Sequence, residues 1–434
     1  MGLTAIDRPT ADEIKQPDRP RLADVLGPGL VTGASDDDPS GIATYSQAGA
    51  QFGYSLIWSL LFTYPLMCAI QMISADIGRV TGRGLAANMR RHYPSWLLYP
   101  LVGLLILANV INLGADLGAM GAAIGLILPG PQWLYIGAFA VVIALMEVYM
   151  RYARYASVLR WLTLSLLAYV ATVFAVGVPW PTVALNLVVP RIEWTGSYLT
   201  VLVAVFGTTI SPYLFFWQAS EEVEDEREDP AAEPLLTAPA QAPRQLARIR
   251  LDTIVGMAAS NLVALFIMLT TAATLHAHGV TDIATSADAA KALQPIAGEF
   301  AFVVFALGIV GTGLLAVPVL AGSAAYALGE ALKWRVGLAE KPGRAPAFYW
   351  AIAAAVVVGA LLNFSPLDPV RALFWSAVVN GVAAVPLMVM IMHMASQRKV
   401  MGEFALKPWL KALGWLATAV MIAAAVGMFA TWND

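Results

Sequence analysis

The sequence predicts an all-α polytopic membrane protein, and three observations lead to that prediction. Hydrophobic residues make up 59% of the 434 residues and charged residues only 13%, and the mean hydropathy is +0.69. Soluble domains, by contrast, contain about 25% charged residues. The chain contains eleven apolar segments of the length that a membrane-spanning helix needs, about 20 residues. Proline and small polar residues interrupt two of these segments near their midpoints.

The eleven apolar segments are expected to be the membrane-spanning helices. Their predicted ranges are 27–50, 54–78, 96–128, 131–149, 156–178, 197–220, 250–277, 298–330, 346–364, 369–395 and 409–431. The residues before them, 1–26, lack the apolar core of a signal peptide and are expected to form a retained N-terminal tail.

Basic residues are distributed unevenly among the loops, and this predicts the orientation of the chain. Of the 26 Lys and Arg residues, all but Arg191, Lys291 and Arg371 lie in the tail or after the second, fourth, sixth, eighth and tenth segments. Lys and Arg favour the cytoplasmic side of a membrane. We therefore expect a protein of the cell (inner) membrane with a cytoplasmic N-terminus and its C-terminus outside.

The first segment is interrupted by the run Asp36-Asp37-Asp38-Pro39-Ser40-Gly41. One Asp at the centre of a membrane helix costs about 2.5–3.5 kcal/mol, so three are tolerated only around a cavity or an ion. Pro39 lacks a backbone donor and Gly41 relaxes the backbone, so the helix is expected to break here. We interpret the run as a cation site. The alternative is that the aspartates cap a helix in a short loop between two segments.

The sixth segment is interrupted by the run Gly207-Thr208-Thr209-Ile210-Ser211-Pro212-Tyr213, in which Pro212 ends the first half-helix. The first and sixth segments each open a set of five, residues 27–178 and 197–395. Because five is odd, the two sets cross the membrane in opposite directions, and paired broken helices are typical of an inverted-repeat transporter. The segment 409–431 is then an eleventh helix outside the repeat. A proline kink without function is the alternative for the sixth segment.

Acidic residues outside the first break are expected to have ordinary roles. The insert 221–249 begins with a run of acidic residues and continues rich in Pro and Ala, which predicts a disordered cytoplasmic linker. Attraction of cations is its alternative role. Asp76 and Glu147 lie next to arginines at cytoplasmic helix ends, where ordinary ion pairs are expected.

The third segment carries Asn109, Asn112 and Asp116, which are spaced to lie on one helical face. Polar side chains in a membrane bundle normally face its interior. We place the three beside a permeation route. Hydrogen bonding between helices is an equally good interpretation for the two asparagines.

Several motifs resemble the NRAMP family of divalent-metal transporters. The resemblance implies a LeuT-like fold in which a metal ion is held between helices one and six. It rests on Gly27-Pro28-Gly29, Asp38-Pro39-Ser40-Gly41, Gln47-Ala48-Gly49-Ala50, the run 207–213, Gly311-Thr312-Gly313-Leu314-Leu315 and Ala321-Gly322-Ser323.

The departures from the family pattern bear on which metal is carried. Asp38 keeps the aspartate of the Asp-Pro-Gly-Asn motif, but Gly41 stands where the asparagine would be. In the sixth helix Ser211 stands in place of the methionine and Tyr213 in place of the histidine. Oxygen ligands suit Mg²⁺, Ca²⁺ and Mn²⁺ better than softer metals, and Mg²⁺ usually keeps several waters. The pattern therefore resembles the NRAMP-related magnesium transporter branch.

Asp38 is expected to be the principal ligand, directly or through one water, because it lies just before the helix break. A looser outer shell is expected from Asp37, Ser211, the Thr208 carbonyl and Gln218, with Asp36 more peripheral, and the route is expected to pass Gly41, Asn109, Asn112, Asp116 and Tyr213.

The predicted function is transport of Mg²⁺, with Mn²⁺ as a further substrate, by alternating access and without a permanent cofactor. No hydrolase, metalloprotease or phosphate-loop motif is present, so an enzyme is not expected. Neither a nucleic-acid partner nor an obligatory protein partner is expected; the partners are divalent ions and the lipid bilayer. The alternatives are a LeuT-fold cation-coupled symporter of a small organic solute and a proton-coupled Mn²⁺/Fe²⁺ transporter.

Proton coupling is not expected, because the family's proton route has no titratable counterpart at three positions. Ala119 falls where the acid of the third helix would be, and Tyr213 and Gln218 fall where the two histidines would be. Neither Tyr nor Gln titrates near neutral pH. Asp116 remains as a possible proton acceptor.

Overall fold

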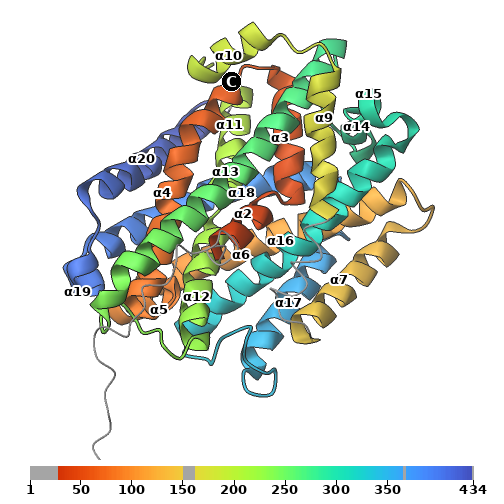
Figure 1. Ribbon diagram of the computed structural model, residues 1–434. Coiled ribbons are helices and arrows are strands. Elements are labelled where there is room, and N and C mark those ends of the chain that lie inside the picture. Colours follow the sequence, from red (N-terminus) through yellow and green to blue (C-terminus); the bar gives the residue numbers. More distant parts are fainter. Residues whose placement is uncertain (1–27, 150–161, 365–367, 433–434) are drawn as a thin grey trace, which may run out of the picture.

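The computed structural model describes residues 28–149, 162–364 and 368–432, and every regular element in these ranges is a helix (Figure 1). Within them, eight helices are long and apolar enough to cross a membrane, or nine if the bent pair Leu164–Ala175 and Trp180–Val188 counts as one span. The all-α membrane fold is thus confirmed, whereas the count of eleven stays a prediction. The tail 1–26 and the start of the fifth predicted segment lie outside the described residues.

Both predicted helix breaks are present. The first segment forms α2 (Pro28–Asp36) and α3 (Pro39–Phe52), and the sixth forms α11 (Gly196–Thr209) and α12 (Pro212–Glu228). A proline begins the second half in each case, because a proline at the first helical position loses no intrahelical hydrogen bond. Figure 1 shows α2 near the centre of the bundle, with α3 above it.

Long helices surround the two broken ones and agree closely with the predicted ranges. They are α4 (Ile57–Thr81), α6 (Ser95–Gly125), α7 (Gln132–Tyr149), α13 (Ala242–Thr274), α16 (Ala301–Leu332), α17 (Pro346–Leu362), α18 (Pro369–Ser396) and α20 (Pro408–Ala430). Shorter helices connect them: α5 (Leu85–His92), α9 (Leu167–Ala175), α10 (Trp180–Val188), α14 (Ser286–Lys291), α15 (Gln294–Ala297) and α19 (Arg398–Met401).

Two glycines let the broken helices pack backbone to backbone against their neighbours. A Cβ at Gly33 of α2 would lie 2.3 Å from the carbonyl oxygen of Gly256 on α13, and one at Gly207 of α11 would lie 2.0 Å from that of Ala377 on α18. Small residues at helix contacts are how membrane helices gain packing without a hydrophobic driving force. These contacts fix α2 and α11, and with them the two breaks, inside the bundle.

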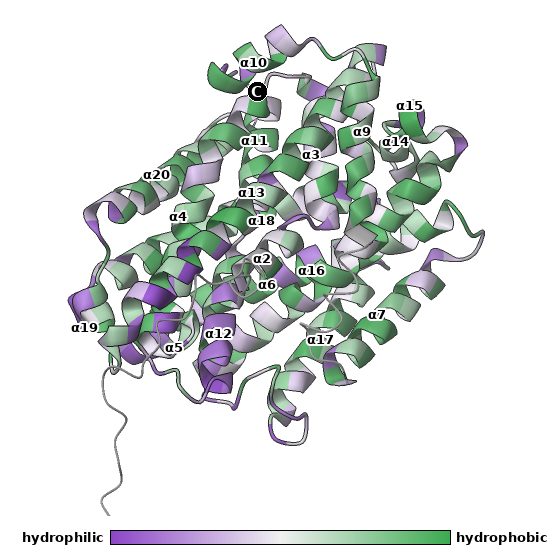
Figure 2. Cartoon of the chain, in the orientation of Figure 1, coloured by the Kyte–Doolittle hydropathy of each residue, from purple (hydrophilic) through white to green (hydrophobic). Residues whose placement is uncertain are grey.

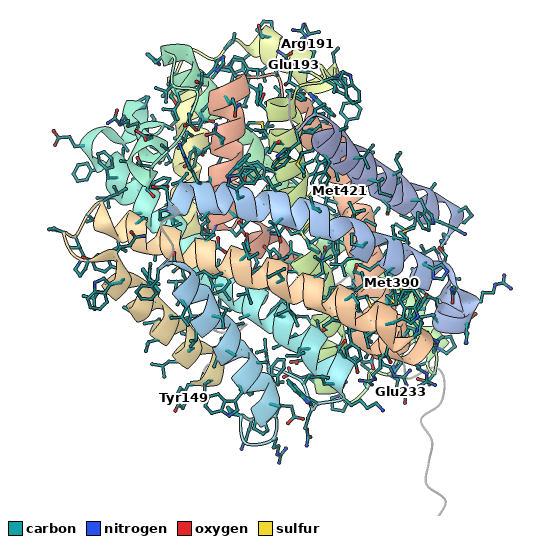
Figure 3. The ribbon with its side chains drawn as sticks, turned by 180° about the vertical axis from the view of Figure 1, so that it is seen from behind. Tyr149, Arg191, Glu193, Glu233, Met390 and Met421 are labelled. Atoms are coloured by element: carbon teal, nitrogen blue, oxygen red, sulfur yellow. The ribbon has the colours of Figure 1, made fainter. Side chains whose placement is uncertain are left out.

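The bundle has two polar ends and an apolar middle. In Figure 2 hydrophilic residues gather most densely over α5, α12 and α19. Figure 3 places Glu233 at this end, and Arg191 and Glu193 at the opposite end. We call these the Glu233 end and the Arg191 end. The C-terminal ends of α4 and α12 and the N-terminal ends of α13 and α20 lie at the Glu233 end.

The expectation of a disordered linker at 221–249 is wrong for this structure. Helix α12 extends through the acidic stretch to Glu228, and its carboxylates have specific partners. Glu222 forms an ion pair with Arg248 of α13, and Glu224 accepts a 2.7 Å hydrogen bond from the backbone N–H of Leu338. Composition alone did not reveal these distant partners, which order the segment.

Candidate metal site

Asp38 occupies the first helix break and caps α3. Its Oδ1 accepts hydrogen bonds from the backbone N–H of Gly41 at 2.6 Å and from the Ser40 hydroxyl at 2.9 Å. The carboxylate is almost fully buried, so its charge is satisfied by the end of the helix rather than by water. Asp38 therefore caps α3, as the alternative interpretation expects of the aspartates, but the break lies inside the first segment rather than in a loop between two segments. Capping uses only Oδ1 and leaves Oδ2 for other partners.

The other oxygen of Asp38 joins three helices. Oδ2 accepts a 2.9 Å hydrogen bond from the amide of Asn112 on α6, and the Asn112 carbonyl accepts one of 2.7 Å from the hydroxyl of Ser376 on α18. Asn109, one turn earlier on α6, instead donates to the carbonyl of Leu320 on α16 at 3.1 Å. The two asparagines thus differ: Asn112 belongs to the site, and Asn109 joins helices.

Asp116 is fully buried on α6 and has no hydrogen-bond partner for either carboxylate oxygen among the described residues. The Ser40 backbone N–H lies near it without reaching hydrogen-bond geometry. The carboxylate therefore faces the same end of α3 that Asp38 caps.

Asp36 and Asp37 point to a different helix from Asp38. Both contact the hydroxyl of Ser260 on α13, Asp36 through Oδ2 at 2.6 Å and Asp37 through Oδ1 at 3.0 Å. Within the described ranges, no three His, Cys, Asp or Glu side chains are grouped so that they could hold a metal ion. The three aspartates therefore form two neighbouring groups rather than one ligand cage.

The second break lies against the first. A Cβ at Gly41 would come within 3.0 Å of the Thr208 hydroxyl and 3.4 Å of Asp38 Oδ1, so a side chain at position 41 would enter the space between the breaks. Ser211 donates to the carbonyls of Gly207 and Thr208, each at 2.9 Å. The hydroxyl oxygen of Ser211 keeps its lone pairs, because it acts as a donor in both contacts.

Tyr213 and Gln218 of α12 serve as links between helices. The Tyr213 hydroxyl donates to the Ser35 carbonyl of α2 at 3.0 Å. Gln218 accepts from the Gln71 amide of α4 at 2.6 Å and donates to the hydroxyl of Thr253 on α13 at 2.9 Å. Both polar atoms of Gln218 therefore have protein partners, and the side chain joins α12 to α4 and α13.

A cavity of about 250 Å³ lies at the Arg191 end of the site. It is lined by Ala43 and Gln47 of α3, by Arg371 of α18 and by Asp282 of the loop after α13. Ala43 follows Asp38 by little more than one helical turn, so the cavity reaches close to the first break.

Ser260, Ser376 and Gln71 contact the predicted site residues but were not predicted from the sequence. Each does have a polar residue at helical spacing, namely Ser74 for Gln71, Thr253 for Ser260 and Asn380 for Ser376. Such pairs are common in these helices and do not by themselves mark a site. The importance of Ser260, Ser376 and Gln71 comes from contacts with residues far away in the chain.

Ser376→Ala is expected to raise the metal concentration needed for half-maximal transport about fivefold while leaving the fold intact. The hydroxyl orients Asn112, which holds Asp38, and one such hydrogen bond is worth about 1 kcal/mol. The measurement is the KM for Mg²⁺ in proteoliposomes. Ser74→Ala is the matched control, because Ser74 is a buried serine whose one side-chain hydrogen bond among the described residues is to the Ile70 carbonyl of its own helix. Equal KM values for the two variants would contradict the role given to Ser376.

Comparison with known proteins gives consistent results. A family model described as natural resistance-associated macrophage protein-like (Nramp) matches residues 29–431. The divalent metal cation transporter MntH of Klebsiella pneumoniae (strain 342) is 26% identical over 410 residues, covering 92% of each chain. The divalent metal cation transporter MntH of Pectobacterium carotovorum is 25% identical over 408 residues, again covering 92% of each chain.

Two solved structures share the fold. A mutant of the Eremococcus coleocola manganese transporter superposes with a TM-score of 0.71 at 17% identity, covering 98% of this chain and 88% of that one. Mhp1, a nucleobase-cation-symport-1 family transporter, gives a TM-score of 0.56 at 14% identity, with coverages of 94% and 93%. These likenesses confirm the expected LeuT-like fold.

Proposed function

Since the chain belongs to the Nramp family of divalent-metal transporters, we propose that its main substrate is Mg²⁺, with Mn²⁺ as a second, and that transport is not coupled to protons. The family makes the chain an integral membrane transporter rather than an enzyme. The names of its relatives point to divalent metals and manganese in those proteins. The preference for Mg²⁺ is our inference from the residues at the two breaks.

The chemistry around Asp38 is the observation that carries the proposal. The hydrogen-bond partners of Asp36, Asp37, Asp38 and Ser211 are hydroxyl, amide and carbonyl groups. Oxygen ligands favour hard cations such as Mg²⁺ and Mn²⁺, whereas a thioether would favour softer metals. Gly41 leaves the space beside Thr208 free of a side chain, and Mg²⁺ prefers to keep several waters.

We propose that Asp38 binds the ion directly or through one water. Asp37, Ser211 and the Thr208 carbonyl would surround it more loosely, with Asp36 more peripheral. In the present arrangement Asn112 donates a hydrogen bond to Asp38 Oδ2, and Ser211 donates one to the Thr208 carbonyl. Arrival of the ion would have to replace these hydrogen bonds by metal or water contacts.

We propose that the Glu233 end faces the cytoplasm of the cell that carries this protein in its inner membrane. The support is the concentration of Lys and Arg in the loops that lead to this end. The cavity at the Arg191 end would then open to the outside and admit the hydrated ion, and alternating access would release it toward the Glu233 end.

Uptake into liposomes tests both substrate and coupling. We expect the purified protein to carry Mg²⁺ and Mn²⁺ into liposomes without a pH gradient and without acidifying the interior. The reason is that Ala119, Tyr213 and Gln218 provide no group that titrates near neutral pH. The measurement is internal pH, recorded together with metal uptake. The control is Asp116→Asn, which removes the remaining buried carboxylate of α6.

Three outcomes of this experiment would contradict the proposal. Uptake of Mn²⁺ without Mg²⁺ would favour an ordinary manganese transporter. Acidification that follows metal entry and disappears in Asp116→Asn would show that a proton path survives through that residue. Lack of Mg²⁺ and Mn²⁺ uptake together with Na⁺-driven entry of a small organic solute would favour a symporter, the class to which Mhp1 belongs.

A further inference from the structure

A small cavity with charged side chains in its lining lies away from the two breaks, at the Glu233 end of the bundle. It has a volume of about 100 Å³ and lies between α4, the start of α13 and the residues just before α20. Four charged side chains line it: Asp76, Arg250, Glu403 and Lys407. Its remaining walls are apolar, with Val80, Leu246 and Leu410 among them.

The charges around this cavity balance in number but are not paired with one another. Asp76 is only 7% exposed, and its Oδ1 is buried without a hydrogen-bond partner; the Nε of Arg250 is also buried and unpartnered. Arg250 and Lys407 are near enough to attract the Asp76 carboxylate electrostatically. None of the ion pairs among the described residues includes Asp76, however. The ordinary ion pair predicted for Asp76 is therefore wrong.

The buried Oδ1 of Asp76 and Nε of Arg250 require partners, whereas Glu403 and Lys407 are exposed. A buried charge that has no opposite charge or hydrogen-bond partner lowers the free energy of unfolding by several kcal/mol. The cavity is well above the roughly 10–15 Å³ that a single water needs. Because both acidic and basic groups face it, a ligand that carries both signs would satisfy more of them than an anion or a cation alone.

The position of the cavity indicates that such a ligand would come from the membrane. In Figure 1, α20, α4 and α13 lie side by side, and α4 contacts both of the others. Trp409, beside Lys407, is 47% exposed, and tryptophan is enriched at the membrane–water interface. Towards the middle of the bundle, Ile254 of α13 and Leu416 of α20 present exposed apolar side chains. These positions are consistent with a cavity at headgroup depth, with exposed apolar side chains further along α13 and α20.

We propose that this cavity binds the headgroup of a phospholipid that carries both a phosphate and a primary ammonium, as phosphatidylethanolamine does. The phosphate would face Arg250 and Lys407, whose N–H groups are suited to phosphate oxygens. The ammonium would donate hydrogen bonds to Asp76 and Glu403. Phosphatidylcholine has the same charges but no N–H donor on its ammonium group, and phosphatidylglycerol lacks the positive charge, so neither satisfies both pairs.

The test is native mass spectrometry of the full-length protein, delipidated in detergent and then given equal amounts of dioleoyl-phosphatidylethanolamine, -phosphatidylcholine and -phosphatidylglycerol. We expect one phosphatidylethanolamine to be retained at least about tenfold better than either competitor. Asp76→Asn should abolish that preference, because it removes the charge that binds the ammonium. Glu233→Gln, which neutralises an exposed carboxylate at the same end, should leave the preference unchanged.

Lys407→Met provides a second variant, because Lys407 is exposed and its replacement should not disturb folding. It should weaken retention of phosphatidylethanolamine even if Asp76→Asn proves unstable. Equal retention of phosphatidylethanolamine and phosphatidylcholine by the unmodified protein would overturn the proposal, as would an unaltered preference in Lys407→Met. Displacement of the lipid by an equal concentration of soluble O-phosphoethanolamine would overturn the assignment to a membrane lipid.

Discussion

Asp38→Ala is expected to reduce uptake of Mg²⁺ and Mn²⁺ to the level of protein-free liposomes. Asp38 is the buried carboxylate at the first break, and it faces both Asn112 of α6 and the amide end of α3. Removing one member of a buried ionic pair costs about 3–5 kcal/mol. At about 1.4 kcal/mol per tenfold, that corresponds to at least a hundredfold loss of affinity. The measurement is initial metal uptake into proteoliposomes.

Asp38 also caps α3, so the alanine variant removes two functions at once. Loss of an N-cap costs about 0.5–2 kcal/mol of stability, and this must be separated from loss of the ligand. Asp38→Asn keeps an oxygen that can accept from the Gly41 N–H but removes the charge, and we expect it to be as inactive as Asp38→Ala while remaining folded.

The chain offers a matched control for this comparison. Asp368 caps α18 through a 2.9 Å hydrogen bond from the Val370 N–H, far along the chain from both breaks. Asp368→Asn makes the same chemical change at the same kind of position, and its uptake should stay normal. Substantial transport by Asp38→Asn would show that Asp38 acts as a helix cap and not as a metal ligand.

The double variant Gly41→Asn, Ser211→Met is expected to shift the preference between Mg²⁺ and Mn²⁺ toward Mn²⁺ by at least about tenfold, or about 1.4 kcal/mol. It restores the asparagine and the methionine thioether that are typical of these positions in the family's transition-metal transporters. A thioether binds softer metals better than Mg²⁺, and a side chain at position 41 would fill space next to Thr208 and Asp38. The measurement is competition between the two ions for uptake.

The effect of side-chain size on the metal preference must be distinguished from the effect of side-chain chemistry. A Cβ at position 41 would lie 3.0 Å from the Thr208 hydroxyl, so that hydroxyl must move by a few tenths of an ångström. Gly41→Asn combined with Ser211→Leu is therefore the control, because Leu and Met are similar in volume and only Met has sulfur. If the Leu control shifts the preference as far as the Met variant does, space rather than ligand softness sets the selectivity.

The sequence by itself determined both breaks and the long apolar helices, whereas the count of eleven spans stays a prediction. Runs of about 20 apolar residues require helices in a membrane, since backbone groups must find partners within the same segment. Pro39 and Pro212 each begin a new helix, because each lacks a backbone N–H and follows polar residues that interrupt the apolar run. Proline alone is not enough, since four others lie inside continuous helices: Pro65, Pro100, Pro318 and Pro386. Asp38 could be singled out because a carboxylate next to a break inside an apolar segment is costly without a partner.

Only the tertiary structure decided which residues become partners. Asn112 and Ser376 are 264 residues apart, and Asp36 and Ser260 are 224 residues apart. Contacts with other parts of the chain also order the acidic insert and place Gln218 between helices. Local sequence specifies where a helix starts, stops and buries a face. Which side chains meet depends on how helices pack, and backbone contacts such as Gly33 against Gly256 set that packing.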